Sequence, residues 1–147
     1  MKNFHFSLET VLSYKQQLVN AAQAELAKIN RKLEQLILEE EEKKHAYDEK
    51  KQAYDEQQKR GITPQMMVFH NDYLHKLRQE IAILERKHTQ LQKEQTAAME
   101  KLIAKRVEAK ALEKLQEKEW QQYKAQAAKE EERLVEELAV NSLVFHA

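Results

Sequence analysis

The chain has 147 residues, of which 34% are charged, and it contains one glycine, one proline and no cysteine. This length fits one ordinary domain, and a composition rich in Ala, Glu, Lys, Leu, Arg and Gln is typical of long helices. Phosphate-binding loops need several glycines so that backbone N–H groups can approach the ligand closely. A lone glycine therefore excludes a Walker-type loop and a dinucleotide fingerprint, and we expect no cofactor.

The charge balance and hydropathy exclude further classes. Lys plus Arg and Asp plus Glu each number 25, so the net charge is zero. Nucleic-acid binders usually carry a basic excess, because phosphate neutralisation dominates their affinity. The first residues lack the apolar core of a signal peptide, and no stretch approaches the ~18 apolar residues of a membrane span. We therefore expect a cytoplasmic protein that binds no nucleic acid, which the absence of cysteine also fits.

A seven-residue repeat runs through the first part of the chain. Its a positions are Leu12, Val19, Leu26, Leu33, Glu40, Tyr47 and Tyr54, and its d positions are Leu8, Lys15, Ala22, Ile29, Leu36, Lys43 and Lys50. A repeat sustained over four or more heptads predicts a coiled coil rather than an isolated amphipathic helix. The seam is apolar as far as Leu36 and is mixed beyond it.

The segment Gly61-Ile62-Thr63-Pro64 is the one strong interruption of this pattern. Gly61 can adopt the left-handed conformation that ends a helix, Thr63 is a good N-cap, and Pro64 loses no needed N–H at a first helical position. The repeat then resumes, with Met67, Leu74, Ile81, His88, Gln95, Leu102 and Ala109 at d and Leu77, Leu84, Leu91, Ala98, Lys105 and Leu112 at a.

The two periodic segments predict an all-α fold of two long helices in an antiparallel coiled-coil hairpin. We expect one domain over residues 1–147, with a helix at about 7–60, a turn at 61–63, a helix at about 64–139 and a frayed tail at 140–147. A short turn joins antiparallel neighbours, which places Leu12 near Leu112. Two registers one heptad apart stay open: one faces Glu40 with His88 and keeps large residues together, and the other fits a tighter turn.

Candidate sites for chemistry are few. No two of the six histidines stand at i,i+3 or i,i+4, the spacing that places two imidazoles on one helix face, so we expect no metal site. The glutamates offer no hydrophobic pocket that would raise a carboxyl pKa for acid–base work. We therefore expect a protein that is not an enzyme.

Aromatic residues gather on both sides of the turn, at Tyr47, Tyr54, Phe69 and Tyr73. Two of them lie on the seam, where a structural coiled coil would prefer Leu or Ile. Two interpretations stay open. The aromatics either fill wider packing near a splayed end or form a partner-binding patch, since aromatics are enriched at interface centres.

Two stretches carry a further signal. They are Phe4-x-Phe6-x-Leu8-x-x-Val11-Leu12-x-x-Lys15 followed by Ala21-Ala22-x-x-Glu25-Leu26, and Arg106-x-x-x-Lys110-x-Leu112-Glu113-Lys114-Leu115-x-Glu117-Lys118 followed by Tyr123. Together with the Gly-x-Thr-Pro turn and the aromatics after it, they resemble the FliJ family over nearly the whole chain. The resemblance implies a component of the flagellar type III export apparatus, with a fold like the coiled-coil stalk of rotary ATPases.

The resemblance also implies partners: the hexameric flagellar export ATPase, the cytoplasmic domain of the export gate membrane protein, and export chaperones that the stalk escorts. It implies a cytoplasmic location, peripheral to the inner face of the cell membrane at the flagellar base. The end with both termini is expected to enter the ATPase ring and to promote its assembly and activity. The matching positions are Phe4, Phe6, Leu8, Val11, Leu12, Lys15, Arg106, Lys110, Leu112, Lys114, Leu115 and Lys118. The export-gate contact is expected at Tyr47, Tyr54, Phe69, Tyr73 and Leu77.

Two alternative functions stay open. The equivalent stalk of an injectisome type III secretion system would share fold and mechanism but serve another organelle. A general coiled-coil scaffold or holdase would need no ATPase partner, and it would carry a flexible apolar tip, whereas the tip of this chain bears tyrosines and charges. A parallel dimer is disfavoured, because the Gly–Pro turn would break it midway.

Overall fold

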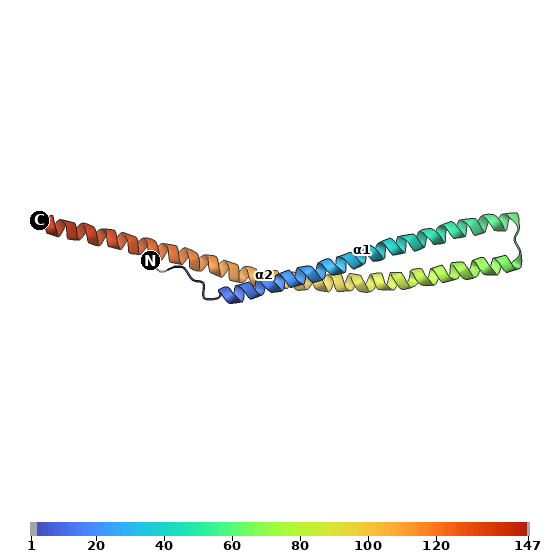
Figure 1. The fold of residues 1–147 in the computed structure, drawn as a ribbon, viewed down its shortest axis with the longest axis horizontal. Coiled ribbons are helices and arrows are strands. Elements are labelled where there is room, and N and C mark those ends of the chain that lie inside the picture. The colour runs from blue at the N-terminus through green and yellow to red at the C-terminus, as the bar shows by residue number, and fades with distance from the viewer. Residues whose placement is uncertain (1–2, 147) are drawn as a thin grey trace. The chain divides into compact units, whose positions relative to one another are not determined.

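Two long helices make up the computed structural model, which describes residues 3–146 and the side chains of residues 3–144. Helix α1 spans Glu9–Arg60 and helix α2 spans Pro64–His146, with residues 61–63 between them. Figure 1 shows both helices extending to the same side of this connection, so their chain directions are opposite. The predicted all-α antiparallel hairpin is therefore confirmed.

Contacts divide the chain into two units, each built from both helices. The turn unit comprises Ala22–Leu102 and contains the connection between the helices. The terminal unit comprises Met1–Ala21 with Ile103–Ala147. The single coiled-coil domain expected over residues 1–147 stays a prediction.

The core of the turn unit follows the heptad repeat. Its buried apolar side chains are Ala22, Leu33, Leu36, Tyr54, Leu74, Leu77, Leu84, Ala98 and Leu102. Each of them occupies a predicted a or d position, so burial follows the seven-residue period. Removing each large side chain of this set from water contributes about 1.5–3 kcal/mol, and the paired seams therefore hold the two helices together.

The connection between the helices has the backbone that its sequence predicts. Gly61 takes a φ of 92°, and its N–H donates to the carbonyl of Gln58 at 3.2 Å, which ends α1. Thr63 caps α2, because its Oγ1 accepts the N–H of Met66 at 3.3 Å. Both ends of the turn are therefore fixed by hydrogen bonds, which satisfy backbone groups at the helix ends that would otherwise lack partners.

Replacing Gly61 with alanine should lower the free energy of unfolding by about 1 kcal/mol. Apart from Gly61 and its two chain neighbours, no residue has an atom within 4 Å of the position that a Cβ would take, so the loss comes from the left-handed backbone alone. Urea unfolding followed by circular dichroism measures it, with Lys59→Ala in the last turn of α1 as the control. Equal stability of the two variants would show that the turn relaxes to an unstrained conformation.

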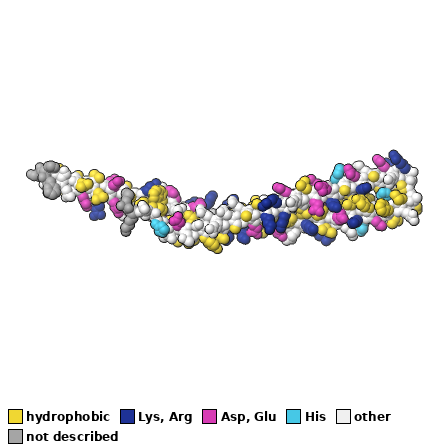
Figure 2. Space-filling model, in the orientation of Figure 1, with side chains coloured by type: hydrophobic (Ala, Val, Ile, Leu, Met, Phe, Trp, Pro, Cys, Tyr) yellow, Lys and Arg dark blue, Asp and Glu magenta, His cyan; other side chains and the backbone are white. Residues whose placement is uncertain are grey.

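Helix α2 ends at His146, beyond the end predicted at about Ala139 and inside the tail predicted as frayed. No glycine or proline follows Pro64, so the sequence contains no residue that breaks the helix there. Ala147 lies outside the described residues. From Ala128 to Val144 every side chain is exposed, and Figure 2 shows hydrophobic side chains at the surface of this part of α2.

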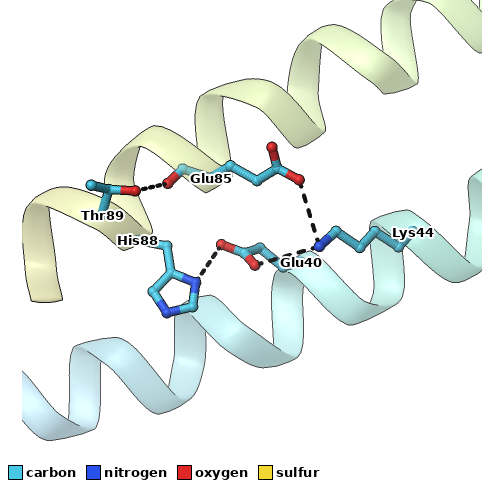
Figure 3. A network of polar contacts seen from close by, with 5 residues as sticks. All are labelled: Glu40, Lys44, Glu85, His88 and Thr89. Carbon is cyan, nitrogen blue, oxygen red and sulfur yellow. Dashed lines mark hydrogen bonds and ion pairs between the residues drawn. The ribbon is translucent and has the colours of Figure 1, made fainter.

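The pairing of α1 with α2 in the turn unit resolves the choice between the two registers. His88 Nδ1 lies 3.0 Å from Oε1 of Glu40, whose residue is only 7% exposed. Lys44 Nζ lies 4.0 Å from the other Glu40 oxygen and 3.6 Å from Glu85, and the four side chains form one network (Figure 3). The register that faces Glu40 with His88 is therefore the one present.

Candidate functional site

The two stretches that carry the family resemblance come together in the terminal unit. All twelve residues predicted to contact an ATPase ring belong to it. Lys15 Nζ lies 3.0 Å from Oε2 of Glu108, and Gln16 Nε2 donates to Glu113 Oε1 at 3.4 Å. Segments separated by about ninety positions in the sequence thus form one surface, as antiparallel pairing requires.

Three of the twelve residues are used inside the fold. Phe6 is 2% exposed and Leu12 is 5% exposed, so both pack in the core of the terminal unit. The ring of Phe4 lies 5.1 Å from that of Trp120 and 5.5 Å from that of Tyr123. Aromatic pairs at these separations attract beyond their buried area, so this cluster holds the segment before α1 against α2.

The other predicted ring-contact residues differ in exposure. Leu8, Leu112 and Lys15 are half-buried, whereas Val11 and Leu115 are exposed. Four further exposed members are basic and recur at every fourth position of α2: Arg106, Lys110, Lys114 and Lys118. We call these four the basic stripe. Residues four apart lie on neighbouring turns of one helix face, so the basic stripe runs along one side of α2, with the carboxylates of Glu113 and Glu117 beside it.

A groove between α1 and α2 adjoins the basic stripe within the terminal unit. Its volume is about 250 Å³, and it is lined by Gln16, Val19, Asn20, Arg106, Ala109, Lys110 and Glu113. The apolar part of the lining comes from Val19 and Ala109, and the cationic part comes from Arg106 and Lys110. A partner side chain can therefore combine apolar contact in the groove with a charged contact to Arg106 or Lys110.

Lys15 and Lys105 together favour the ionised form of Glu108. The hydrogen bond from Lys15, then the charge of Lys105, lower the pKa of the Glu108 carboxyl below its usual range. A lowered carboxyl pKa in the folded chain gives stability that is present above the ordinary glutamate pKa and is lost as the pH falls through the folded value. Because Glu108 is exposed, solvent screens the effect and its contribution is small.

Substituting Lys15 with methionine should raise the pKa of Glu108 back toward that of an ordinary glutamate, with little change in helicity. Methionine keeps the length of the side chain but removes the charge and the hydrogen bond. Carbon-13 NMR titration of the Glu108 carboxyl measures the shift. Gln16→Met is the control, since its contact goes to Glu113 instead. A Glu108 pKa that moves equally in both variants would contradict the assignment.

In the turn unit, three of the five predicted gate-contact residues are used by the fold. Tyr54 and Leu77 are buried in the core, and the Tyr54 ring lies 5.1 Å from that of His70. Tyr47 is half-buried, and its hydroxyl accepts a hydrogen bond from Arg78 Nε at 2.7 Å. The two tyrosines on the seam, Tyr47 and Tyr54, therefore make packing contacts between the helices.

The other two gate-contact residues face outward. Phe69 is 63% exposed and Tyr73 is 40% exposed, with Lys50 Nζ 5.7 Å from the centre of the Tyr73 ring. Neither occupies an a or d position of the repeat. Phe69 and Tyr73 are therefore the members of the predicted gate face that a partner can reach from solvent.

Comparison with known proteins identifies the family of the chain and a solved structure with a similar fold. The sequence matches the FliJ family, described as "Flagellar FliJ protein", over residues 4–144. The structure is similar to that of CT670 from Chlamydia trachomatis, described as a YscO homologue, with 25% identity and a TM-score of 0.57. That likeness covers 92% of this chain and 90% of CT670. No curated protein matches the chain.

The fold defines an antiparallel coiled-coil protein, and no helix in its described residues is long and apolar enough to cross a membrane. The family match then identifies the chain within that class. The protein belongs to the FliJ family and is a component of the flagellar export apparatus. Membership fits the expectation of a non-catalytic protein that works through partners of that apparatus.

Proposed function

We propose that the protein acts as a stalk of the flagellar export apparatus, with its terminal unit engaging the hexameric export ATPase and favouring assembly of the ring. In the same proposal, the turn unit contacts the export gate at the inner face of the cell membrane, and the protein escorts export chaperones. The chain supplies a stiff pair of helices and surface charge, and the ATPase supplies the energy.

The observation that supports the stalk proposal is the joining of the two family-like stretches in the terminal unit. Lys15 from the first stretch pairs with Glu108 within the second, at 3.0 Å. That pairing leaves the basic stripe exposed on α2, next to the groove between the helices. A positive helix face steers association with an acidic partner surface and is screened by salt, which gives the proposal a measurable signature.

The gate contact is proposed for Phe69 and Tyr73, because they are aromatic, exposed and free of core packing. Aromatic side chains concentrate binding energy at interfaces, where truncation of an anchor typically costs 1 kcal/mol or more. Tyr47, Tyr54 and Leu77 would then support this face from behind. Chaperone escort rests on the family alone.

The stalk proposal predicts that the protein raises the activity of the cognate export ATPase at low subunit concentration. A stalk that binds the ring better than the free subunits shifts assembly by mass action, so the increase should shrink once the subunits assemble alone. Activity assays and sedimentation across a range of subunit concentrations measure both quantities. An ATPase whose activity and oligomeric state are indifferent to this protein at every concentration would refute the proposal.

Reversing three charges of the basic stripe, with Lys110→Glu, Lys114→Glu and Lys118→Glu, should reduce that stimulation, more strongly at low salt. Helicity should change little, because exposed i,i+4 pairs contribute only about 0.2–0.5 kcal/mol each. The matched control reverses three exposed lysines of the turn unit: Lys28, Lys32 and Lys93. Equal loss of stimulation in both triple variants would show that net charge, not the basic stripe, is responsible.

A role in an injectisome is the second candidate function, and it is favoured by the likeness to CT670, the YscO homologue. Two observations in cells separate the candidates: the genes that surround the coding sequence, and the process lost on deletion. Loss of flagellar assembly supports the stalk of the flagellar system. Loss of injectisome secretion with intact flagella supports the alternative.

A further inference from the structure

The first two turns of α2 expose four consecutive apolar side chains, of which only Met67 occupies a seam position. Met66 is 45% exposed, Met67 37%, Val68 59% and Phe69 63%. Successive helical residues are about 100° apart, so four of them point in almost all directions around the helix axis. One seam between two helices buries only one side of each, and three of these side chains therefore remain outside whatever the register.

Local structure accounts for Met67 but not for its neighbours. Ile62 precedes the N-cap Thr63, and Met67 is the fourth helical residue, which are the two positions of a hydrophobic staple. Phe69 lies edge-on against His70, with 5.8 Å between the ring centres. Met66 and Val68 occupy neither an a nor a d position, so the fold gives their exposed surface no role.

The charge around this apolar turn is positive. The sequence has no acidic residue between Glu56 and Asp72, whereas the last turn of α1 carries Lys59 and Arg60. The chain as a whole has no net charge, so a local excess of two basic residues stands out. Figure 2 shows dark blue basic side chains beside yellow hydrophobic ones at the end of the turn unit that carries the connection. We call Lys59, Arg60, Met66 and Val68 the turn-end patch.

The geometry points to one occupant. A protein groove binds one face of a helix, but the exposed apolar side chains here lie on several sides of the helix end. A lipid bilayer can accept all of them at once when the end of the helix enters it. A second copy of this chain would bring two positive ends together, which is unfavourable. The bilayer interface accepts apolar side chains below the headgroups and attracts Lys and Arg when its lipids are anionic. We propose that the turn-end patch binds the surface of an anionic lipid bilayer.

This inference goes beyond the proposed function, and its test needs neither an ATPase nor a gate protein. The protein is sedimented with vesicles of phosphatidylcholine alone and with an equimolar mixture of phosphatidylcholine and phosphatidylglycerol. We expect binding to the anionic vesicles, weaker binding as salt rises, and little binding to phosphatidylcholine. Failure of the protein to bind anionic vesicles at low salt would overturn the proposal.

Two double variants separate the electrostatic from the apolar contribution. Lys59→Gln/Arg60→Gln should weaken partitioning into anionic vesicles roughly 25-fold, since each basic residue near such a surface contributes about 1 kcal/mol. Met66→Ser/Val68→Ser should also weaken it but leave the salt dependence unchanged. Both variants retain the proposed gate residues, so a loss of vesicle binding is distinguishable from a loss of the gate contact.

The matched control for the apolar variant is Ile103→Ser/Val107→Ser, whose side chains are 56% and 62% exposed on α2 in the terminal unit. It should bind vesicles as the unmodified protein does. Because the chain has no cysteine, a single Val68→Cys substitution can also carry an environment-sensitive fluorophore, whose emission should shift to shorter wavelength on anionic vesicles. Equal binding by both serine variants, or no shift at Val68, would show that the turn-end patch is not the contact.

Discussion

Phe6→Ala should destabilise the terminal unit by about 3–5 kcal/mol, the range measured when a large buried aromatic side chain is removed. Phe6 is the most deeply buried large side chain of the described residues, at 2% exposure. It lies in the segment before α1, which is held against α2 by side chains and not by the helix ladder. The loss should therefore appear first as local opening of the start of α1.

Hydrogen exchange locates that opening. The N–H of Glu9 donates to the carbonyl of Phe6 at 3.2 Å, and the N–H of Leu12 donates to that of Leu8 at 2.8 Å. Both amides should lose protection in Phe6→Ala, whereas amides of the turn unit should keep theirs. Val11→Ala, at an exposed position in the first turn of α1, is the control. Unchanged protection at Glu9 would mean that Phe6 does not hold the segment in place.

A second substitution at Phe6 tests whether this residue of the first family-like stretch acts through the fold or by contact with the ATPase. Phe6→Leu keeps an apolar side chain of moderate size and should retain much of the stability. If Phe6 acts only through the fold, this variant should stimulate the export ATPase nearly as the unmodified protein does. Normal stability with lost stimulation would instead place the Phe6 ring in contact with the ATPase.

Periodicity in the sequence was enough to predict most of the fold. Leu33, Leu77 and Leu102 are buried because the seven-residue repeat places them on the seam, and Gly61 ends α1 because a left-handed residue is needed there. The same repeat also predicts which aromatic residues near the turn are buried and which are exposed. Tyr54 lies at an a position and is buried, whereas Phe69 lies off the seam and is exposed.

Contacts outside the repeat could not be predicted in this way. The cluster of Phe4, Trp120 and Tyr123 joins an irregular segment to a helix, and no period connects their positions. Met66 and Val68 are exposed because α2 begins at Pro64 and no other described segment packs against the sides of the helix that carry them. The register was open for a different reason, since a shift by one whole heptad again places a and d residues of one helix opposite a and d residues of the other.

The polar pair of Glu40 and His88 distinguishes the two registers, and we expect a large effect on stability when it is broken. Substituting Glu40 with leucine should lower the free energy of unfolding by about 1–3 kcal/mol, because His88 then loses its hydrogen-bond partner inside the seam. Glu40 Oε1 lies 3.0 Å from His88 Nδ1 (Figure 3). The double variant Glu40→Leu/His88→Leu should recover this loss or exceed the original stability, since apolar replacement of a buried pair is often neutral or favourable. Urea unfolding measures both effects.

The double variant should nevertheless lose its unique register. In the register one heptad away, Glu40 would face Ile81 and lose its hydrogen bond to His88, a penalty that leucine at position 40 removes. Cysteine pairs can detect the slip, because the chain has no cysteine of its own. Lys43 Nζ lies 3.0 Å from Glu80 Oε2, so cysteines at 43 and 80 report the present register, and cysteines at 43 and 73 report the slipped one.

With Glu40 and His88 intact, only the pair at 43 and 80 should form a disulfide. With leucine at both positions, the pair at 43 and 73 should also form one, as happens when a coiled coil loses the polar contact that fixes its alignment. Loss of the Lys43–Glu80 ion pair affects both cysteine designs equally, and exposed pairs contribute little. A double leucine variant that is stable and still forms only the first disulfide would show that leucine packing, and not the Glu40–His88 pair, sets the register.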